Sequence, residues 1–143
     1  MPVTVSIYNN TLLRFLNGAN SPSDTYKVKL LTAATFDGTH TTLASTGGTE
    51  TANSFGYTTG GQTLTNVVVS TVTTNDAKFD ADDAVWTAAG GSITAAYAIL
   101  YNASDAGEPP VAFVNFDAME SVSDGQQFRI GWNANGIFTF TVT

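Results

Sequence analysis

The segment FGYTTGGQTLTNVVVS, residues 55–70, gives the clearest local indication of fold in this chain. Its glycines Gly56, Gly60 and Gly61 allow backbone turns in which a Cβ atom would clash. Aromatic anchors stand beside these glycines, and a β-branched run then favours extended backbone. The segment therefore predicts the rim and first strand of an all-β domain, and it contains no reactive group.

Alternation of apolar and polar residues recurs on both sides of this segment. Gly- and Asn-rich turn signals separate the alternating runs at a spacing of about 8–12 residues. The pattern predicts about eight strands in an antiparallel β-sandwich, jelly-roll-like and formed as a single domain over residues 1–143. The clearest run places five residues on one face of a strand: Ile93, Ala95, Tyr97, Ile99 and Tyr101.

Two segments depart from the strand pattern. Thr11–Asn17 predicts one short helix, ended by Gly18, and its apolar residues nearly surround it, so we expect burial against the sheet. Thr32–Ser54 has many threonines and few apolar residues. We expect it to be an extended or mobile excursion that becomes ordered against a neighbouring subunit.

The expected core is made of apolar residues that face inward on the predicted strands and helix. Its members are Phe15, Tyr26, Val28, Leu64, Trp86, Tyr97, Ile99, Phe113, Phe128, Ile130, Trp132 and Phe138.

Composition excludes several classes of function. The net charge is −7, with five basic residues, so no basic stripe exists to bind nucleic acid or an anionic membrane surface. The chain has no cysteine, which excludes disulfides and thiol chemistry. No signal sequence or apolar run of membrane-spanning length is present, so we expect a soluble protein made in a reducing cytoplasm.

An acidic group is the sharpest candidate for a metal site. Asp76, Asp80, Asp82 and Asp83 could bind Ca²⁺, but the glycine and glutamate spacing of an EF-hand is missing. A solvated strand edge with exposed carboxylates is the favoured interpretation. We therefore expect no metal and no cofactor.

Catalytic patterns are also weak. His40, the one histidine, lies among threonines without the partners of a triad. Asp117 and Glu120 could form a carboxylate pair for glycoside hydrolysis, although no other signal supports it. The sequence therefore predicts a protein that is not an enzyme and has no catalytic residue.

Four aromatic residues leave a binding function open. Trp86, Tyr97, Tyr101 and Trp132 could form a platform on which a sugar stacks. On alternating strand positions such residues more often belong to the core, which is the favoured interpretation.

Several segments together resemble a family of small tailed-phage and prophage virion proteins. The resemblance lies in segments spread over nearly the whole chain: 8–9, 23–31, 56–65, 79–87, 96–102 and 132–139. It implies a capsid decoration (cement) protein or another virion component, and the family has no catalytic motif to transfer. Thr32–Ser54 matches least well.

The resemblance implies a location in the virion after assembly in the bacterial cytoplasm. The expected partners are the major capsid protein and copies of the chain itself, with a homotrimer favoured by analogy to threefold capsid positions. A tail-fibre or lectin-like module that binds a receptor or carbohydrate is the alternative. The expected contact residues lie on the N-terminal arm and the glycine rim: Val3, Val5, Phe55, Gly56, Tyr57, Gly60 and Gly61.

Overall fold

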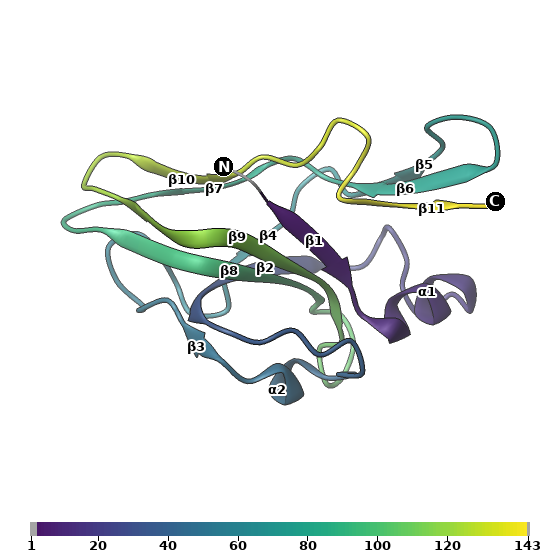
Figure 1. Ribbon diagram of the computed structural model, residues 1–143, viewed down its shortest axis with the longest axis horizontal. Coiled ribbons are helices and arrows are strands. Elements are labelled where there is room, and N and C mark those ends of the chain that lie inside the picture. Colours follow the sequence, from purple (N-terminus) through teal and green to yellow (C-terminus); the bar gives the residue numbers. More distant parts are fainter. Residues whose placement is uncertain (1–2, 143) are drawn as a thin grey trace.

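The computed structural model describes residues 3–142, which form β-strands joined by turns and two short helices (Figure 1). The helices are α1 (Asn9–Leu16) and α2 (Leu43–Thr46). The strands are β1 (Thr4–Ile7), β2 (Tyr26–Ala33), β3 (Thr49–Glu50), β4 (Gln62–Thr63), β5 (Val68–Ser70), β6 (Asp76–Asp80), β7 (Ala84–Thr87), β8 (Ile93–Asn102), β9 (Pro110–Val122), β10 (Gln127–Ile130) and β11 (Phe138–Thr141).

The strands form two layers. One layer is a six-stranded sheet in the order β1-β9-β8-β2-β3, with β4 also paired to β2. The other contains the pair β10-β7 and the three-stranded sheet β11-β6-β5, which lie above it in Figure 1. All of these pairs are antiparallel, so the predicted all-β, sandwich-like fold is confirmed. Strands of two or three residues, such as β3, β4 and β5, are too short for an alternation pattern, which is why the sequence predicts fewer strands.

The main core fills the space between the layers. Most of the predicted core residues are buried: Tyr26, Val28, Leu64, Trp86, Ile99, Phe113, Phe128 and Ile130. The other four, Phe15, Tyr97, Trp132 and Phe138, are half-buried and pack against the edges of the cores. The core prediction is therefore confirmed for these eight residues, whereas the other four are less buried than predicted.

Strand β8 does not keep one face as predicted. Ile93 and Ala95 belong to the main core, whereas Tyr97 and Ile99 lie on the opposite face of the sheet. The pairing register with β9 shifts between Ala95 and Tyr97, because β9 carries extra residues there. Alternation assumes a regular strand, and a bulge reverses the face of every residue beyond it.

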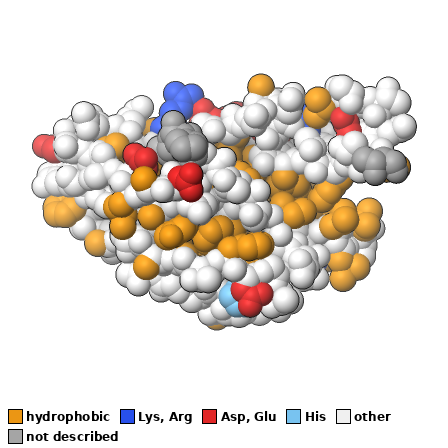
Figure 2. Space-filling view, viewed as in Figure 1, with side chains coloured by type: hydrophobic (Ala, Val, Ile, Leu, Met, Phe, Trp, Pro, Cys, Tyr) orange, Lys and Arg blue, Asp and Glu red, His pale blue; other side chains and the backbone are white. Residues whose placement is uncertain are grey.

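A second, smaller core covers part of the outer face of the six-stranded sheet. Its buried members are Tyr8, Leu31, Ile99 and Phe113. Figure 2 shows a band of hydrophobic side chains across the middle of this view, in the region that lies in Figure 1 between the sheet and the segment bearing α2.

The expectation that Thr32–Ser54 is an extended excursion is wrong, because this segment folds over the smaller core. The Phe36 ring lies 5.1 Å from that of Tyr8 and 5.5 Å from that of Phe113. The Thr51 N–H donates to the Leu30 carbonyl at 2.9 Å. The segment needs no core of its own, since its few apolar residues complete a core supplied by the sheet.

Candidate protein-binding surface

Helix α1 is fastened to the sheet along one side. The Thr11 hydroxyl is fully buried and donates to the Val111 carbonyl at 2.8 Å. The Phe15 ring packs edge-on against Phe79, with 5.4 Å between ring centroids. The helix begins two residues before the predicted Thr11, and Tyr8 at its N-cap makes no side-chain capping bond.

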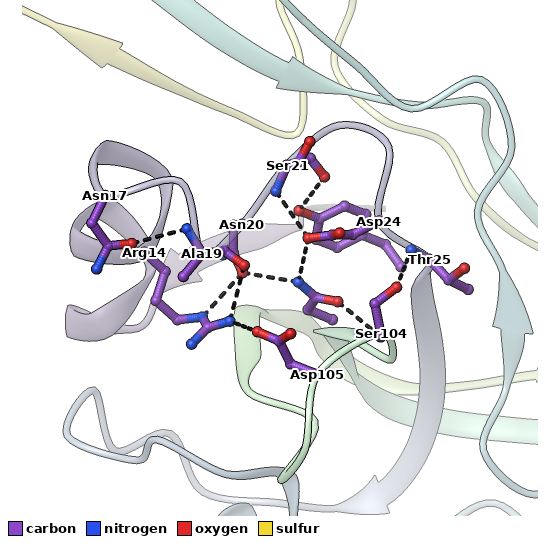
Figure 3. Close-up of polar contacts among 11 residues, drawn as sticks. Arg14, Asn17, Ala19, Asn20, Ser21, Asp24, Thr25, Ser104 and Asp105 are labelled. Carbon is purple, nitrogen blue, oxygen red and sulfur yellow. Dashed lines mark hydrogen bonds and ion pairs between the residues drawn. The ribbon is translucent and has the colours of Figure 1, made fainter.

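An arginine on α1 extends this attachment to the loop between β8 and β9 (Figure 3). Arg14 forms an ion pair with Asp105 of that loop. Its Nε also donates to the Asn20 Oδ1 at 3.0 Å, and its Nη2 donates to the Ala19 carbonyl at 3.1 Å. The guanidinium thus ties the helix to the turn that follows it and to a loop far away in the sequence.

A buried amide continues the same polar network. The Asn102 side chain is completely buried, and its Nδ2 donates to the Asn20 Oδ1 at 3.0 Å and to the Asp24 Oδ2 at 2.9 Å. Its Oδ1 accepts from the Ser104 N–H at 2.9 Å. Buried polar groups that are satisfied in this way rigidify the surrounding structure, so α1 is held at a fixed position.

The other side of α1 is apolar and exposed. Leu12, Leu13 and Leu16 are 39%, 59% and 78% exposed, and in Figure 2 hydrophobic side chains gather at the position of α1. The predicted burial of this helix against the sheet is confirmed on the Thr11 and Phe15 side and is wrong for its three leucines. Thr11 and Phe15 occupy the side that faces the sheet, and a two-turn helix with apolar residues around it must present the rest outward.

Leu12 and Leu16 border two adjoining hollows between α1 and the three-stranded sheet, of about 320 Å³ and 780 Å³, and Leu13 is exposed beside them on the helix. Both hollows are lined by Leu12, Leu16, Ala77 and Phe140. We name the whole area the α1–β11 surface and define it by its exposed or half-buried apolar residues: Leu12, Leu13, Leu16, Val69, Phe140 and Val142. Charged residues at the margin are already paired locally, as Lys78 is with Asp80 at 3.1 Å.

The strands beside this surface are two short sheet edges. β5 and β11 are the outer strands of the three-stranded sheet. Neither contains a charged residue or a proline. Native proteins usually place such residues on free edges to prevent pairing with other chains, so these edges are open to a partner.

The predicted acidic group does not converge on one point. The Asp76 carboxylate accepts from the Thr73 hydroxyl at 2.7 Å and from the Thr73 and Val72 N–H groups at 2.9 and 2.8 Å. These bonds, the Thr73 hydroxyl first, hold the pKa of Asp76 below its usual value. Asp80 is half-buried and accepts from Lys78. Among residues 3–142, no three acidic or histidine side chains are grouped as metal ligands would be.

Asp82 and Asp83, the other two acidic residues, are also engaged in local hydrogen bonds. The Asp83 Oδ2 accepts from the Arg129 Nε at 2.9 Å, and its Oδ1 accepts from the Trp132 N–H at 3.0 Å. The Arg129 bond, followed by the Trp132 bond, lowers the pKa of Asp83. Asp82 is exposed and accepts from the Asn66 amide at 2.6 Å. The expectation that these carboxylates are exposed is therefore confirmed for Asp82 but wrong for Asp80 and Asp83, which are half-buried.

The remaining catalytic candidates lie in two parts of the chain, His40 in the segment after β2, and Asp117 and Glu120 on β9. The His40 Nε2 lies 3.8 Å from the Asp37 Oδ2, and its buried Nδ1 has no hydrogen-bond partner within the described residues. Asp117 lies in the bulge of β9, while Glu120 is back in register opposite Ala95.

The predicted contact residues on the glycine rim pack against the domain itself. Tyr57 is 2% exposed. A Cβ atom on Gly56 would lie 2.1 Å from the Thr87 carbonyl oxygen, and one on Gly61 would lie 1.8 Å from that of Val28. Gly56 and Gly61 are therefore needed for close internal packing, although Gly56 itself is exposed. The contact role of the rim stays a prediction.

The other predicted contact residues differ in accessibility. Gly60 is half-buried, and its N–H donates to the Glu50 carboxylate at 2.6 Å. Val5 is half-buried against the main core. Val3 and Phe55 remain exposed, at 40% and 47%. Met1 and Pro2 of the N-terminal arm lie outside the described residues.

The four aromatic residues of the sugar-stacking alternative do not form one platform. Trp86 and Tyr101 are buried. Trp132 is half-buried and its Nε1 donates to the Asp82 carbonyl at 3.1 Å. Tyr97 lies on the outer face of the six-stranded sheet.

Comparison with protein-family models, curated proteins and solved structures finds no match. The phage-family resemblance therefore stays a prediction. The α1–β11 surface was missed because the apolar helix was expected to be buried against the sheet. The available signal was the arrangement of the α1 leucines, since Leu12, Leu13 and Leu16 cover more than one helical face.

Among the described residues, no helix has the length and apolar character needed to cross a membrane.

Proposed function

We propose that this chain is a virion structural protein of a tailed phage or prophage, and that it decorates the outside of an icosahedral capsid. The family resemblance motivates the proposal. The α1–β11 surface is the observation that carries it, because it offers a fixed apolar area and two open strand edges to a protein partner.

The exposed leucines suit a permanent protein contact. A specific interface needs roughly 1,000 Å² or more of total buried area and usually has an apolar centre with a polar rim. The apolar part of the α1–β11 surface provides such a centre. The Thr71, Asn75 and Thr141 side chains beside it provide uncharged polar groups for the rim.

The rigidity of α1 adds to the suitability of this surface. Arg14 and Asn102 hold the helix through bonds to two separate segments, so little conformational freedom is lost when a partner binds. Preorganisation of this kind reduces the entropic cost of association. The major capsid protein is the partner that we assign to this surface.

The experiment is quantitative mass spectrometry of purified particles, combined with cryo-electron microscopy of their heads. The proposal predicts this chain at capsid-like copy number, as density on the outer shell with α1 facing the capsid. Particles that lack the chain should have heads that burst at lower temperature. Normal heads on particles that fail to adsorb to the host would contradict the proposal and favour receptor binding.

A further inference from the structure

An open groove of about 590 Å³ lies on the outer face of the six-stranded sheet, away from the α1–β11 surface. Its volume falls within the range of roughly 300–1,000 Å³ that is typical of small-molecule sites. One wall is the end of β2 with the segment after it, and the other is the bulge of β9. The lining residues are Thr32, Ala33, Ala34, Thr35, Thr46, Gly48, Ala96, Tyr97, Asn115, Asp117, Ala118 and Met119.

The β9 wall is built by an unusually wide bulge. Tyr97 pairs with Asn115 and Ala95 pairs with Glu120, so residues 116–119 of β9 stand opposite Ala96 alone. Phe116 is 1% exposed and its ring lies 5.7 Å from that of Phe128, which anchors the bulge in the main core.

The next residue turns outward from this anchor. Asp117 has a φ of 67°, a left-handed conformation that aspartate tolerates better than most residues. Its N–H donates to the Asn115 Oδ1 at 2.8 Å, which fixes the turn. The bulge therefore presents Asp117 at the rim of the groove on a defined backbone, as bulges near functional sites do.

Small side chains around one aromatic ring create the space. Ala33, Ala96 and Ala118 line the groove. The half-buried Tyr97 ring rests against Phe113, with 5.5 Å between centroids and a 35° tilt. The ring is held from behind, so its remaining exposed part offers a fixed apolar surface to a ligand.

Polar groups at the groove are left unused by the protein. Within residues 3–142, no hydrogen bond engages the Asp117 carboxylate, the Asn115 amide nitrogen or the Tyr97 hydroxyl, and Asp117 has no ion-pair partner. These groups supply an acceptor, a donor and a group that does both. No lysine or arginine lines the groove, so an anionic ligand would find no counter-charge.

We propose that this groove binds a neutral saccharide. The apolar face of one sugar ring packs on Tyr97, while its hydroxyls donate to the Asp117 carboxylate and accept from the Asn115 amide. The site is independent of the proposed capsid contact, because it lies on a different surface and uses different residues.

The experiment is a two-dimensional NMR titration of the isolated chain with three probes: maltotriose, the N-acetylglucosamine trisaccharide and the anionic sialyllactose. At least one neutral trisaccharide should shift the amide signals of Ala96, Asn115 and Met119. D117N should weaken that binding about tenfold, because one acceptor oxygen becomes a donor. Y97L keeps an apolar contact to Phe113 but removes the flat ring, and it should abolish the shifts.

The matched control is E120Q, because Glu120 is a carboxylate on the same strand that does not line the groove. It should bind as the wild type does. The proposal is overturned if no neutral probe binds, if sialyllactose binds at least as well, if the shifts lie elsewhere, or if D117N and E120Q behave alike. None of these results bears on particle copy number, so the capsid proposal is tested separately.

Discussion

The Tyr57 hydroxyl donates to the Glu50 carboxylate at 2.6 Å and accepts from the Leu30 N–H at 3.0 Å. Burial, followed by the Glu50 bond, raises the pKa of this hydroxyl, so it stays protonated. The same Glu50 oxygen accepts from the Gly60 N–H at 2.6 Å. The glycine rim is thus locked onto β2 and β3.

Y57F removes this link and should lower the free energy of unfolding by about 1–3 kcal/mol, because it leaves the Leu30 N–H without a partner and takes one of two hydrogen bonds from the Glu50 oxygen. Urea denaturation measures the change. Y97F is the control, since no intramolecular bond engages that hydroxyl within the described residues, and it should change stability little. Equal losses for the two variants would contradict the role of the Tyr57 bonds.

Gly61 and Gly90 have nearly the same φ, so alanine substitutions at the two positions distinguish the cost of a steric clash from the cost of a left-handed backbone. Gly61 has a φ of 79° and Gly90 a φ of 78°, but only a Cβ on Gly61 would meet the sheet, 1.8 Å from the Val28 oxygen. We expect G90A to cost about 1 kcal/mol, the penalty of a left-handed alanine. G61A should cost at least twice as much or prevent folding, as measured by urea denaturation and soluble yield. Similar stabilities would show that the rim can move away from β2.

The ion pair of Asp83 predicts a pH-dependent stability. Its pKa is lowered in the folded state by Arg129 and the Trp132 N–H. The stabilisation is therefore fully present above the unfolded pKa of about 3.9, and it is lost as the pH falls through the folded pKa. D83N should be less stable than the wild type in urea at neutral pH, and the difference should shrink toward zero in acid. A difference that does not change with pH would contradict this assignment.

The sequence was sufficient for the fold class because alternation is a local signal. It also located many central core residues, such as Val28, Trp86 and Phe128. It could not reveal the bulge at residues 116–119, because alternation patterns assume regular pairing and both faces of β8 are apolar there. The groove at Tyr97 depends on that bulge, so it could not be predicted either.

The α1–β11 surface could not be predicted for a different reason. An apolar helix is buried only if enough of the molecule surrounds it, and sequence alone does not give the amount of cover. Here Thr11 and Phe15 take the sheet side, and Leu13 and Leu16 are left outside. Likewise, the Thr32–Ser54 segment folds because Phe36 meets Tyr8 and Phe113, which are distant in the chain.

Rebinding of the purified chain to capsids that lack it tests the central claim most directly. Leu13 and Met119 are 59% and 54% exposed, so L13D and M119D place a charge at equally accessible positions on different surfaces. The measurement is the number of bound copies per capsid, after circular dichroism has shown that both variants are folded. We predict that the wild type and M119D bind at the copy number of native particles and that L13D does not. Normal binding of L13D, or no binding by the wild type, would contradict the assignment of the α1–β11 surface to a capsid contact.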